Sequence, residues 1–170
     1  MLRSSWKCRR TTNWCSLSQR RSTMTYPREG GCQCGAIRYT IDKRPRFTFA
    51  CHCTDCQRRS GSAVVVSLLI PEGWFRITRG NPTPQTRTND KGRVLKHWFC
   101  SECGTPILGM VRGTAPELYQ TVRIGTLDNS RGLPPPVHVW TRSAQDWFVF
   151  PPGAKCFEES PPVPLLQLVD

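Results

Sequence analysis

The chain has 170 residues, 38% of them hydrophobic, with 15 prolines and 13 glycines, which argues against a helical bundle and favours one loop-rich β domain. The net charge is +12 at pH 7, but residues 1–24 hold six basic and no acidic residues, which leaves 18 basic against 12 acidic residues elsewhere. No dense basic run is interleaved with aromatic residues, so nucleic acid is disfavoured as a partner. The longest apolar run, residues 63–70, is too short to cross a membrane.

The first 25 residues differ in composition from the rest, since they are rich in Ser, Thr and Arg and contain no acidic residue. We expect residues 1–25 to be a disordered basic extension, either a mitochondrial transit peptide or sequence upstream of a true start at Met24. Residues 26–161 are predicted to form the folded domain, and residues 162–170 a C-terminal tail. Cys8 and Cys15 lie in the extension and are not predicted to bind metal.

From Tyr26 onward, the pattern predicts short strands separated by turns, with one helical turn at Thr54–Arg59 and no long helix. Residues 80–92 predict a loop or an irregular hairpin, and the Pro-rich end from Pro151 is expected to wrap the surface. Alternating or continuous apolar residues predict strands over Ile37–Ile41, Phe47–Phe49, Ala63–Ile70, Phe75–Ile77, Val94–Phe99, Pro106–Val111, Leu118–Ile124, Val137–Thr141 and Trp147–Phe150.

The ten cysteines indicate a metal-binding protein rather than a secreted disulfide protein. Residues 1–24 lack the apolar segment of a secretory signal peptide. C-x-C and C-x-x-C spacings in a chain without such a signal favour metal ligands over disulfides. We therefore expect a cytoplasmic location, or a mitochondrial one if residues 1–24 are a transit peptide.

Seven of the cysteines form three tight clusters, Cys32-Gln-Cys34, Cys51-His-Cys53-Thr-Asp-Cys56 and Cys100-Ser-Glu-Cys103. Structural zinc takes four protein ligands, whereas catalytic zinc takes three and keeps an open position. Seven cysteines therefore predict two zinc ions, one structural and one catalytic.

The first and third clusters are each followed directly by a glycine, Gly35 and Gly104. A metal knuckle needs a tight turn, and glycine adopts positive φ without a steric penalty. We therefore predict that Cys32, Cys34, Cys100 and Cys103 hold the structural zinc and cross-link the domain.

The middle cluster, Cys51, Cys53 and Cys56, lies at the end of a predicted strand and on one helical turn, so it can bind a metal from one side. We predict an open three-thiolate site, with His52 pointing away from the metal. A closed structural site, in which His52, His97, His138 or Cys156 supplies a fourth ligand, is the alternative.

Five motifs in this order resemble the glutathione-dependent formaldehyde-activating enzyme family, which also includes centromere protein V. They are Gly30-Gly-Cys-Gln-Cys-Gly-Ala-Ile-Arg-Tyr39, Cys51-His-Cys-Thr-Asp-Cys-Gln-Arg-Arg-Ser-Gly61, Phe99-Cys-Ser-Glu-Cys-Gly-Thr-Pro106, Gly125-Thr-Leu-Asp128 and His138-Val-Trp-Thr-Arg-Ser143. The resemblance covers the chain from about Tyr26 to Pro161. It implies an all-β, zinc-ribbon-like fold of the Mss4-like kind, built of short antiparallel strands.

The resemblance also implies a structural zinc on the first and third clusters and a catalytic zinc on Cys51, Cys53 and Cys56. The implied reaction is carbon–sulfur lyase chemistry, the reversible joining of glutathione, or another small thiol, to an aldehyde such as formaldehyde. A non-catalytic zinc module that binds protein or nucleic acid is the alternative. Because zinc with three thiolates and a substrate thiolate is anionic, Arg58 or Arg59 is expected to bind a substrate carboxylate, the alternative being two solvated arginines.

Overall fold

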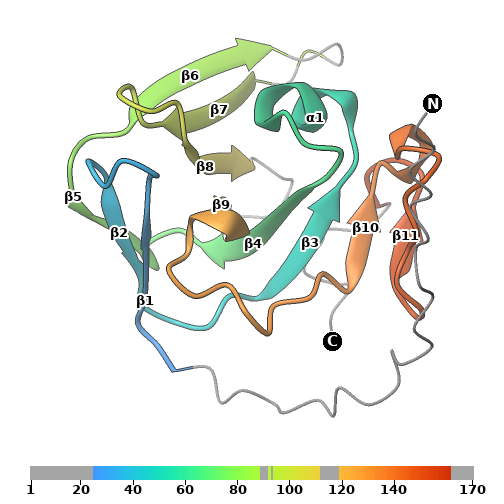
Figure 1. Cartoon of the computed structure of the whole chain (residues 1–170), viewed down its shortest axis with the longest axis horizontal. Helices are drawn as coiled ribbons and strands as arrows, with labels where there is room; N and C mark the ends of the chain where they lie inside the picture. The colour runs from blue at the N-terminus through green and yellow to red at the C-terminus, as the bar shows by residue number, and fades with distance from the viewer. Residues whose placement is uncertain (1–24, 89–91, 93, 112–118, 162–170) are drawn as a thin grey trace, which may run out of the picture.

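The computed structural model describes residues 25–88, 92, 94–111 and 119–161, and its regular secondary structure is almost entirely β-strand (Figure 1). The predicted extension and the C-terminal tail lie outside these residues, apart from Thr25. One helix, α1 (Thr54–Ser60), and two short 3₁₀ turns, η1 (Ile124–Thr126) and η2 (Thr141–Ser143), accompany the strands. The strands are β1 (Arg28–Gly31), β2 (Arg38–Ile41), β3 (Phe47–Cys51), β4 (Val65–Pro71), β5 (Phe75–Arg79), β6 (Thr83–Thr88), β7 (Val94–Phe99), β8 (Pro106–Val111), β9 (Tyr119–Arg123), β10 (Val137–Val139) and β11 (Lys155–Phe157).

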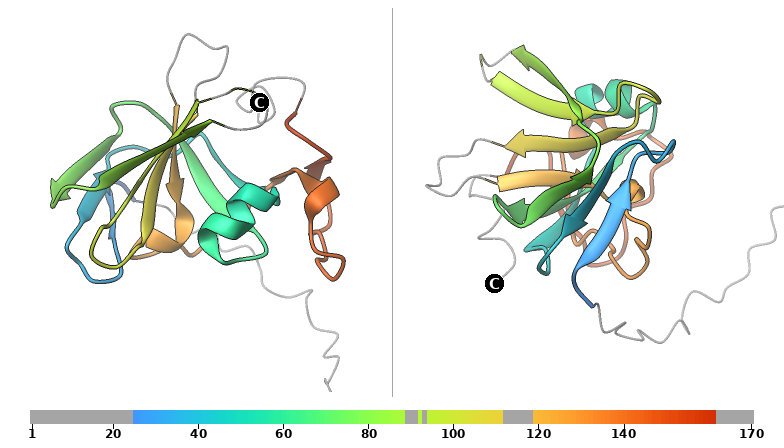
Figure 2. Two further views of the ribbon diagram at one scale, coloured as in Figure 1. Left: turned by 90° about the horizontal axis from the view of Figure 1, so that it is seen from above. Right: turned by 90° about the vertical axis from the view of Figure 1, so that its left-hand side faces the viewer.

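The strands form two sheets, which confirms the all-β prediction. Three strands make a small sheet in the order β1-β2-β5, and eight make a large one in the order β11-β10-β3-β4-β9-β8-β7-β6. Figure 2 shows that the large sheet is strongly curved and that the small sheet packs beside it. Among the described residues, no helix has the length and the apolar character needed to cross a membrane.

The main core lies where the two sheets face each other. Tyr39 and Ile41 of β2 pack against Leu68, Ile70 and Val122 of the large sheet, and all five side chains are fully or almost fully buried. Burying one such side chain stabilises the folded state by about 1.5–3 kcal/mol. The alternation of apolar residues in β2 therefore orients the small sheet on the large one.

A second apolar cluster occupies the other face of the large sheet. Phe47, Phe49 and Cys51 of β3 pack there with Val137 and Val139 of β10. The side chains of Cys53 and Cys56 lie at its edge. Helix α1 and the Cys51–Cys56 corner thus stand on the opposite face of the large sheet from the main core.

Four details of the strand prediction differ from the structure. Residues 147–150 form no strand, because Phe148 and Phe150 cover a buried histidine pair instead of pairing in the sheet. Residues 83–88, placed in a loop or hairpin by the sequence, form β6 and pair along their whole length with β7. Residues 155–157 of the Pro-rich end form β11. Strand β10 is parallel to both β3 and β11, whereas antiparallel strands were expected.

Candidate functional site

Two loops from different sheets bring four cysteines together. Cys32 and Cys34 lie in the loop between β1 and β2 of the small sheet, and Cys100 and Cys103 lie between β7 and β8 of the large sheet. Their four sulfur atoms all lie within 4.8 Å of one another. The Sγ atoms of Cys34 and Cys100, which are 66 residues apart in the sequence, are separated by 3.8 Å. A metal bound here would cross-link the two sheets.

Local backbone geometry shapes these two loops as the sequence predicted. Gly35 and Gly104 have φ angles of 78° and 73°, and each donates its N–H to the carbonyl of the cysteine that begins its turn. The Cys32 sulfur accepts a hydrogen bond from a backbone N–H at 3.1 Å. The Thr105 hydroxyl, followed by backbone N–H groups, lowers the pKa of Cys103 to about 5. These contacts favour the thiolate form, which is the form that binds metal.

The other three cysteines meet at the corner between β3 and α1. Cys51 is the last residue of β3, Cys53 caps the N-terminus of α1, and Cys56 lies in its first turn. The Cys53 sulfur accepts the Cys56 backbone N–H at 3.3 Å, as an N-cap side chain does. All three sulfur atoms lie within 4.8 Å of one another.

The electrostatics of this corner fit a bound divalent cation. Contacts from the Cys51 and Cys56 thiols, with backbone N–H groups of the first helical turn, lower the pKa of Cys53 to about 2. The same sulfur contacts raise the pKa of Cys51. Three adjacent thiolates repel one another, so all of them ionise together only beside a cation. A set of three thiolate donors suits zinc, and both cysteine groups are compatible with it.

None of the proposed fourth ligands joins the three sulfur atoms in the described part of the chain. His52 points away, as predicted, since its Nε2 lies 3.0 Å from Nδ1 of His138 in a buried pair. Phe148 and Phe150 pack edge-on against the His52 ring. Cys156 is exposed on β11, beyond His138.

The remaining candidate, His97, lies on β7 in the middle of the large sheet. It pairs with Gly109 of β8, and a Cβ added to that glycine would lie 2.9 Å from the His97 Nδ1 atom. The imidazole therefore lies over the neighbouring strand and not in the Cys100 knuckle. The alternation of residues in β7 alone could not distinguish these two orientations, because the β7 register shifts between Trp98 and Phe99.

Gln57 of α1 is a supporting residue that the sequence analysis missed. Its amide nitrogen donates to the carbonyl oxygens of His52 at 2.6 Å and Ser143 at 2.7 Å. Gln145 in turn donates to the Gln57 side-chain oxygen at 2.8 Å. The corner that presents Cys51 and Cys53 is thus attached to the segment after β10. Only the long-range pairing of β10 with β3 reveals this link.

Arg58 and Arg59 lie in different surroundings although they are adjacent. Arg58 is exposed, whereas Arg59 is half-buried and close enough to interact electrostatically with Cys56. Arg123 of β9 also interacts with Cys56 and was not singled out from the sequence. In the sequence, Arg123 is marked only as a charged residue that follows the buried Thr121 and Val122 on a strand.

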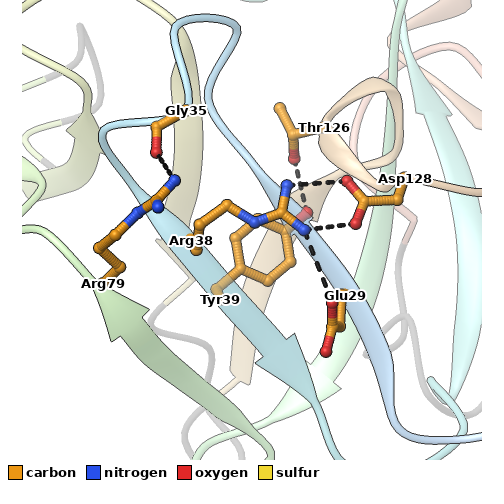
Figure 3. Close-up of polar contacts among 7 residues, drawn as sticks. All are labelled: Glu29, Gly35, Arg38, Tyr39, Arg79, Thr126 and Asp128. Atoms are coloured by element: carbon orange, nitrogen blue, oxygen red, sulfur yellow. Dashed lines mark hydrogen bonds and ion pairs between the residues drawn. The ribbon is translucent and has the colours of Figure 1, made fainter.

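Two of the sequence motifs meet at the edge of the small sheet, as Figure 3 shows. The Arg38 guanidinium binds both carboxylate oxygens of Asp128 and also pairs with Glu29 at 3.7 Å. The hydroxyl groups of Tyr39 and Thr126 are hydrogen-bonded at 2.7 Å. These contacts hold the segment after β9 against β2, which is a structural role.

The chain is similar to one known protein family and to a solved structure. The model of the family described as glutathione-dependent formaldehyde-activating enzyme matches residues 27–143. No curated protein matches the chain. Among solved structures, the crystal structure of a Rhodobacter sphaeroides protein, a structural-genomics target, is similar at 26% identity and a TM-score of 0.46. That match covers 59% of this chain and 88% of the other. Because the family match spans more than half of its residues, the chain belongs to the glutathione-dependent formaldehyde-activating enzyme family.

Proposed function

We propose that the protein is a zinc-dependent carbon–sulfur lyase that joins a small thiol to an aldehyde. Glutathione and formaldehyde are the first substrates to test, with S-hydroxymethylglutathione as the product. Membership of the family supports an activity related to these two compounds. The observation that carries the proposal is the group of Cys51, Cys53 and Cys56, which no fourth ligand completes in the described part of the chain.

The two cysteine groups take different roles in this proposal. Cys32, Cys34, Cys100 and Cys103 hold a structural zinc that joins the sheets. Cys51, Cys53 and Cys56 hold the catalytic one. A zinc ion bound by three thiolates supplies a fourth position in which a substrate thiol is kept as the thiolate.

The reaction itself needs only a thiolate and a proton. A free thiol has a pKa of about 8.5, and its thiolate is the nucleophile. The sulfur attacks the aldehyde carbon, a carbon–sulfur bond forms, and the carbonyl π electrons pass to the oxygen, which takes up a proton from solvent. The reverse reaction breaks the carbon–sulfur bond and releases the aldehyde.

The chain contributes positioning and charge to this step. Cys51 is held by the sheet, and Gln57 fixes the carbonyl of the next residue, so the backbone that carries the three sulfur atoms is held in place. Holding both reactants there turns a bimolecular encounter into a local one. Arg59 and Arg123 lie near Cys56 and offset the negative charge that three thiolates and a substrate thiolate bring together.

A metal and turnover assay tests the proposal. Zinc content of the purified protein is measured, and thiol–aldehyde exchange is followed by NMR over a panel of thiols and aldehydes. We expect two zinc ions per chain and faster exchange for at least one pair, abolished by Cys56→Ser. Full zinc content without acceleration of any pair would contradict the enzyme proposal and favour a non-catalytic zinc module.

A further inference from the structure

Strand register places three basic side chains of the large sheet on the face that carries Cys51. Residues paired across strands share a face, as do residues two apart along a strand. Cys51 pairs with Val65 of β4, and two residues further along that strand Ser67 pairs with Arg123 of β9. Thr121, two residues before Arg123, pairs with Gly109 of β8, and Gly109 pairs with His97 of β7. His97 in turn pairs with Gln85 of β6, and Arg87 lies two residues further along that strand, so both share the face.

Helix α1 adds a fourth basic side chain above this face. Its Asp55 forms an ion pair with Arg87 at 2.5 Å, so one side of the helix is turned toward β6. Arg59 lies four residues after Asp55 and therefore on the same side. Its Nη1 atom is buried and has no hydrogen-bond partner among the described residues.

The positive charges of Arg59 and Arg123 are not balanced by ion pairs with the described acidic residues. Asp55 pairs with Arg87, but no carboxylate of the described residues forms an ion pair with Arg59 or Arg123. Arg123 donates to the neutral Ser67 hydroxyl at 2.8 Å. Burial lowers the pKa of Arg59, and the nearby Arg123 lowers it further. Cys56 and Asp55 act on this pKa in the opposite direction, and two guanidinium groups that interact in this way are stabilised further when an additional anion lies between them.

His97 adds a second unsatisfied group to the same face. Its Nδ1 atom is buried without a partner among the described residues. Burial lowers its pKa to about 3, and the charges of Arg59, Arg123 and Arg87 act in the same direction, so the ring is neutral. Buried polar atoms in folded proteins are nearly always hydrogen-bonded. Unpaired atoms on Arg59 and His97 therefore indicate a ligand on this face.

We propose that Arg59 and Arg123 form a carboxylate-binding subsite beside the three-cysteine corner, with His97 as a neutral hydrogen-bonding group. A guanidinium binds a carboxylate through paired hydrogen bonds, which a lysine does not. The subsite selects thiols that carry a carboxylate over neutral thiols. This assignment rests on the proposed function, since it places the carboxylate on the thiol that binds at the cysteines.

Binding measurements on the zinc-loaded protein test the subsite separately from turnover. Isothermal titration calorimetry compares glutathione with its dimethyl ester, which keeps the thiol but has no free carboxylate. We expect the wild type to bind glutathione at least about tenfold more tightly, the factor that one charged hydrogen bond provides. Arg59→Ala should bind the acid and the ester equally. Arg58→Ala, which alters the exposed neighbour on the same helix, should keep the preference.

Structural damage is separated from loss of the subsite by zinc content and melting temperature. Arg59→Gln, which keeps a polar side chain without charge, replaces the alanine variant if that variant does not fold. Equal binding of acid and ester by the wild type, no binding of either, or an unchanged preference in the Arg59 variants would each overturn the subsite. Preference for the acid without any turnover would support the subsite and contradict the proposed reaction.

Discussion

The two cysteine groups differ in how far apart their members lie in the sequence. In the four-cysteine group, loops 66 residues apart converge from two sheets. In the three-cysteine group, all members lie within the Cys51–Cys56 corner on one sheet face. A metal in the first group closes a long loop and so stabilises the fold, whereas a metal in the second constrains only a strand end and one helical turn. A metal in the four-cysteine group would thus join the two sheets, whereas the three-cysteine group takes its geometry from the strand and the helix that carry it.

Removing one ligand from each group tests this contrast most directly. Cys100→Ser should leave the domain unfolded, because structural zinc binding contributes about 10 kcal/mol or more, which is comparable to the whole stability of a small domain. Cys53→Ser should stay folded, since serine also caps a helix N-terminus. Circular dichroism melting and zinc analysis of both variants provide the measurement. Equal collapse of the two variants would show that both sites are structural.

Metal removal should also distinguish the two groups. We expect a chelator to take the zinc from Cys51, Cys53 and Cys56 first, because that site has three protein ligands and one open side. The second zinc should leave only with unfolding. Zinc release followed with a colorimetric chelator, alongside circular dichroism, would give two phases. A single phase that coincides with unfolding would contradict the distinction.

Changing Gln57 should weaken metal binding at the three-cysteine group and leave the four-cysteine group unchanged. Gln57→Ala leaves the carbonyls of His52 and Ser143 without their hydrogen-bond donor, which lowers the free energy of unfolding by about 1–3 kcal/mol. Loss of such support lowers metal affinity by about 10–100-fold at the three-cysteine group, with no change at the other. Competition with a chelator of known affinity measures both sites. Arg58→Ala is the matched control, and an equal loss at both groups would rule out a positioning role.

The smallest expected effect concerns the ion pair at the edge of the small sheet. The Arg38 guanidinium lowers the pKa of Asp128, so the carboxylate stabilises the fold above the unfolded-state pKa of about 3.9. That stability is lost as the pH falls through the lower pKa of the folded state. Because Asp128 is half exposed, Asp128→Asn should cost less than about 1 kcal/mol at neutral pH. Urea unfolding of both proteins across a pH series should show the difference shrinking in acid; a constant difference would contradict the ion-pair explanation.

The sequence predicted those parts of the molecule whose causes are local. Cysteine spacing with a following glycine predicted the loops at Cys32 and Cys100, and apolar alternation predicted β2 and β9. The sequence also predicted the strand end and the helical turn that carry Cys51, Cys53 and Cys56. In each case the determining residues lie within one turn or strand of one another.

Features that depend on distant pairing were not predictable in the same way. Strand β6 is polar on both faces because it lies at the edge of the sheet and is largely exposed, so it shows no apolar alternation. The aromatic run at Phe148 and Phe150 resembled a strand but packs on His52 and His138. The basic cluster of Arg59, Arg123 and His97 arises from the register of five strands and one helix, which no local spacing encodes.

The attachment of the three-cysteine corner to the segment after β10 has a consequence for synthesis. His52 and Gln57 each contact residues 86 positions later in the chain, through His138 and Ser143. Chains emerge from the ribosome N-terminus first, so the three neighbouring thiols of this corner are translated long before the residues that hold them in place. Cys103, the last member of the four-cysteine group, is also translated before that segment. The contacts that His52 and Gln57 make with this late segment therefore cannot form until residues 138–143 have been synthesised.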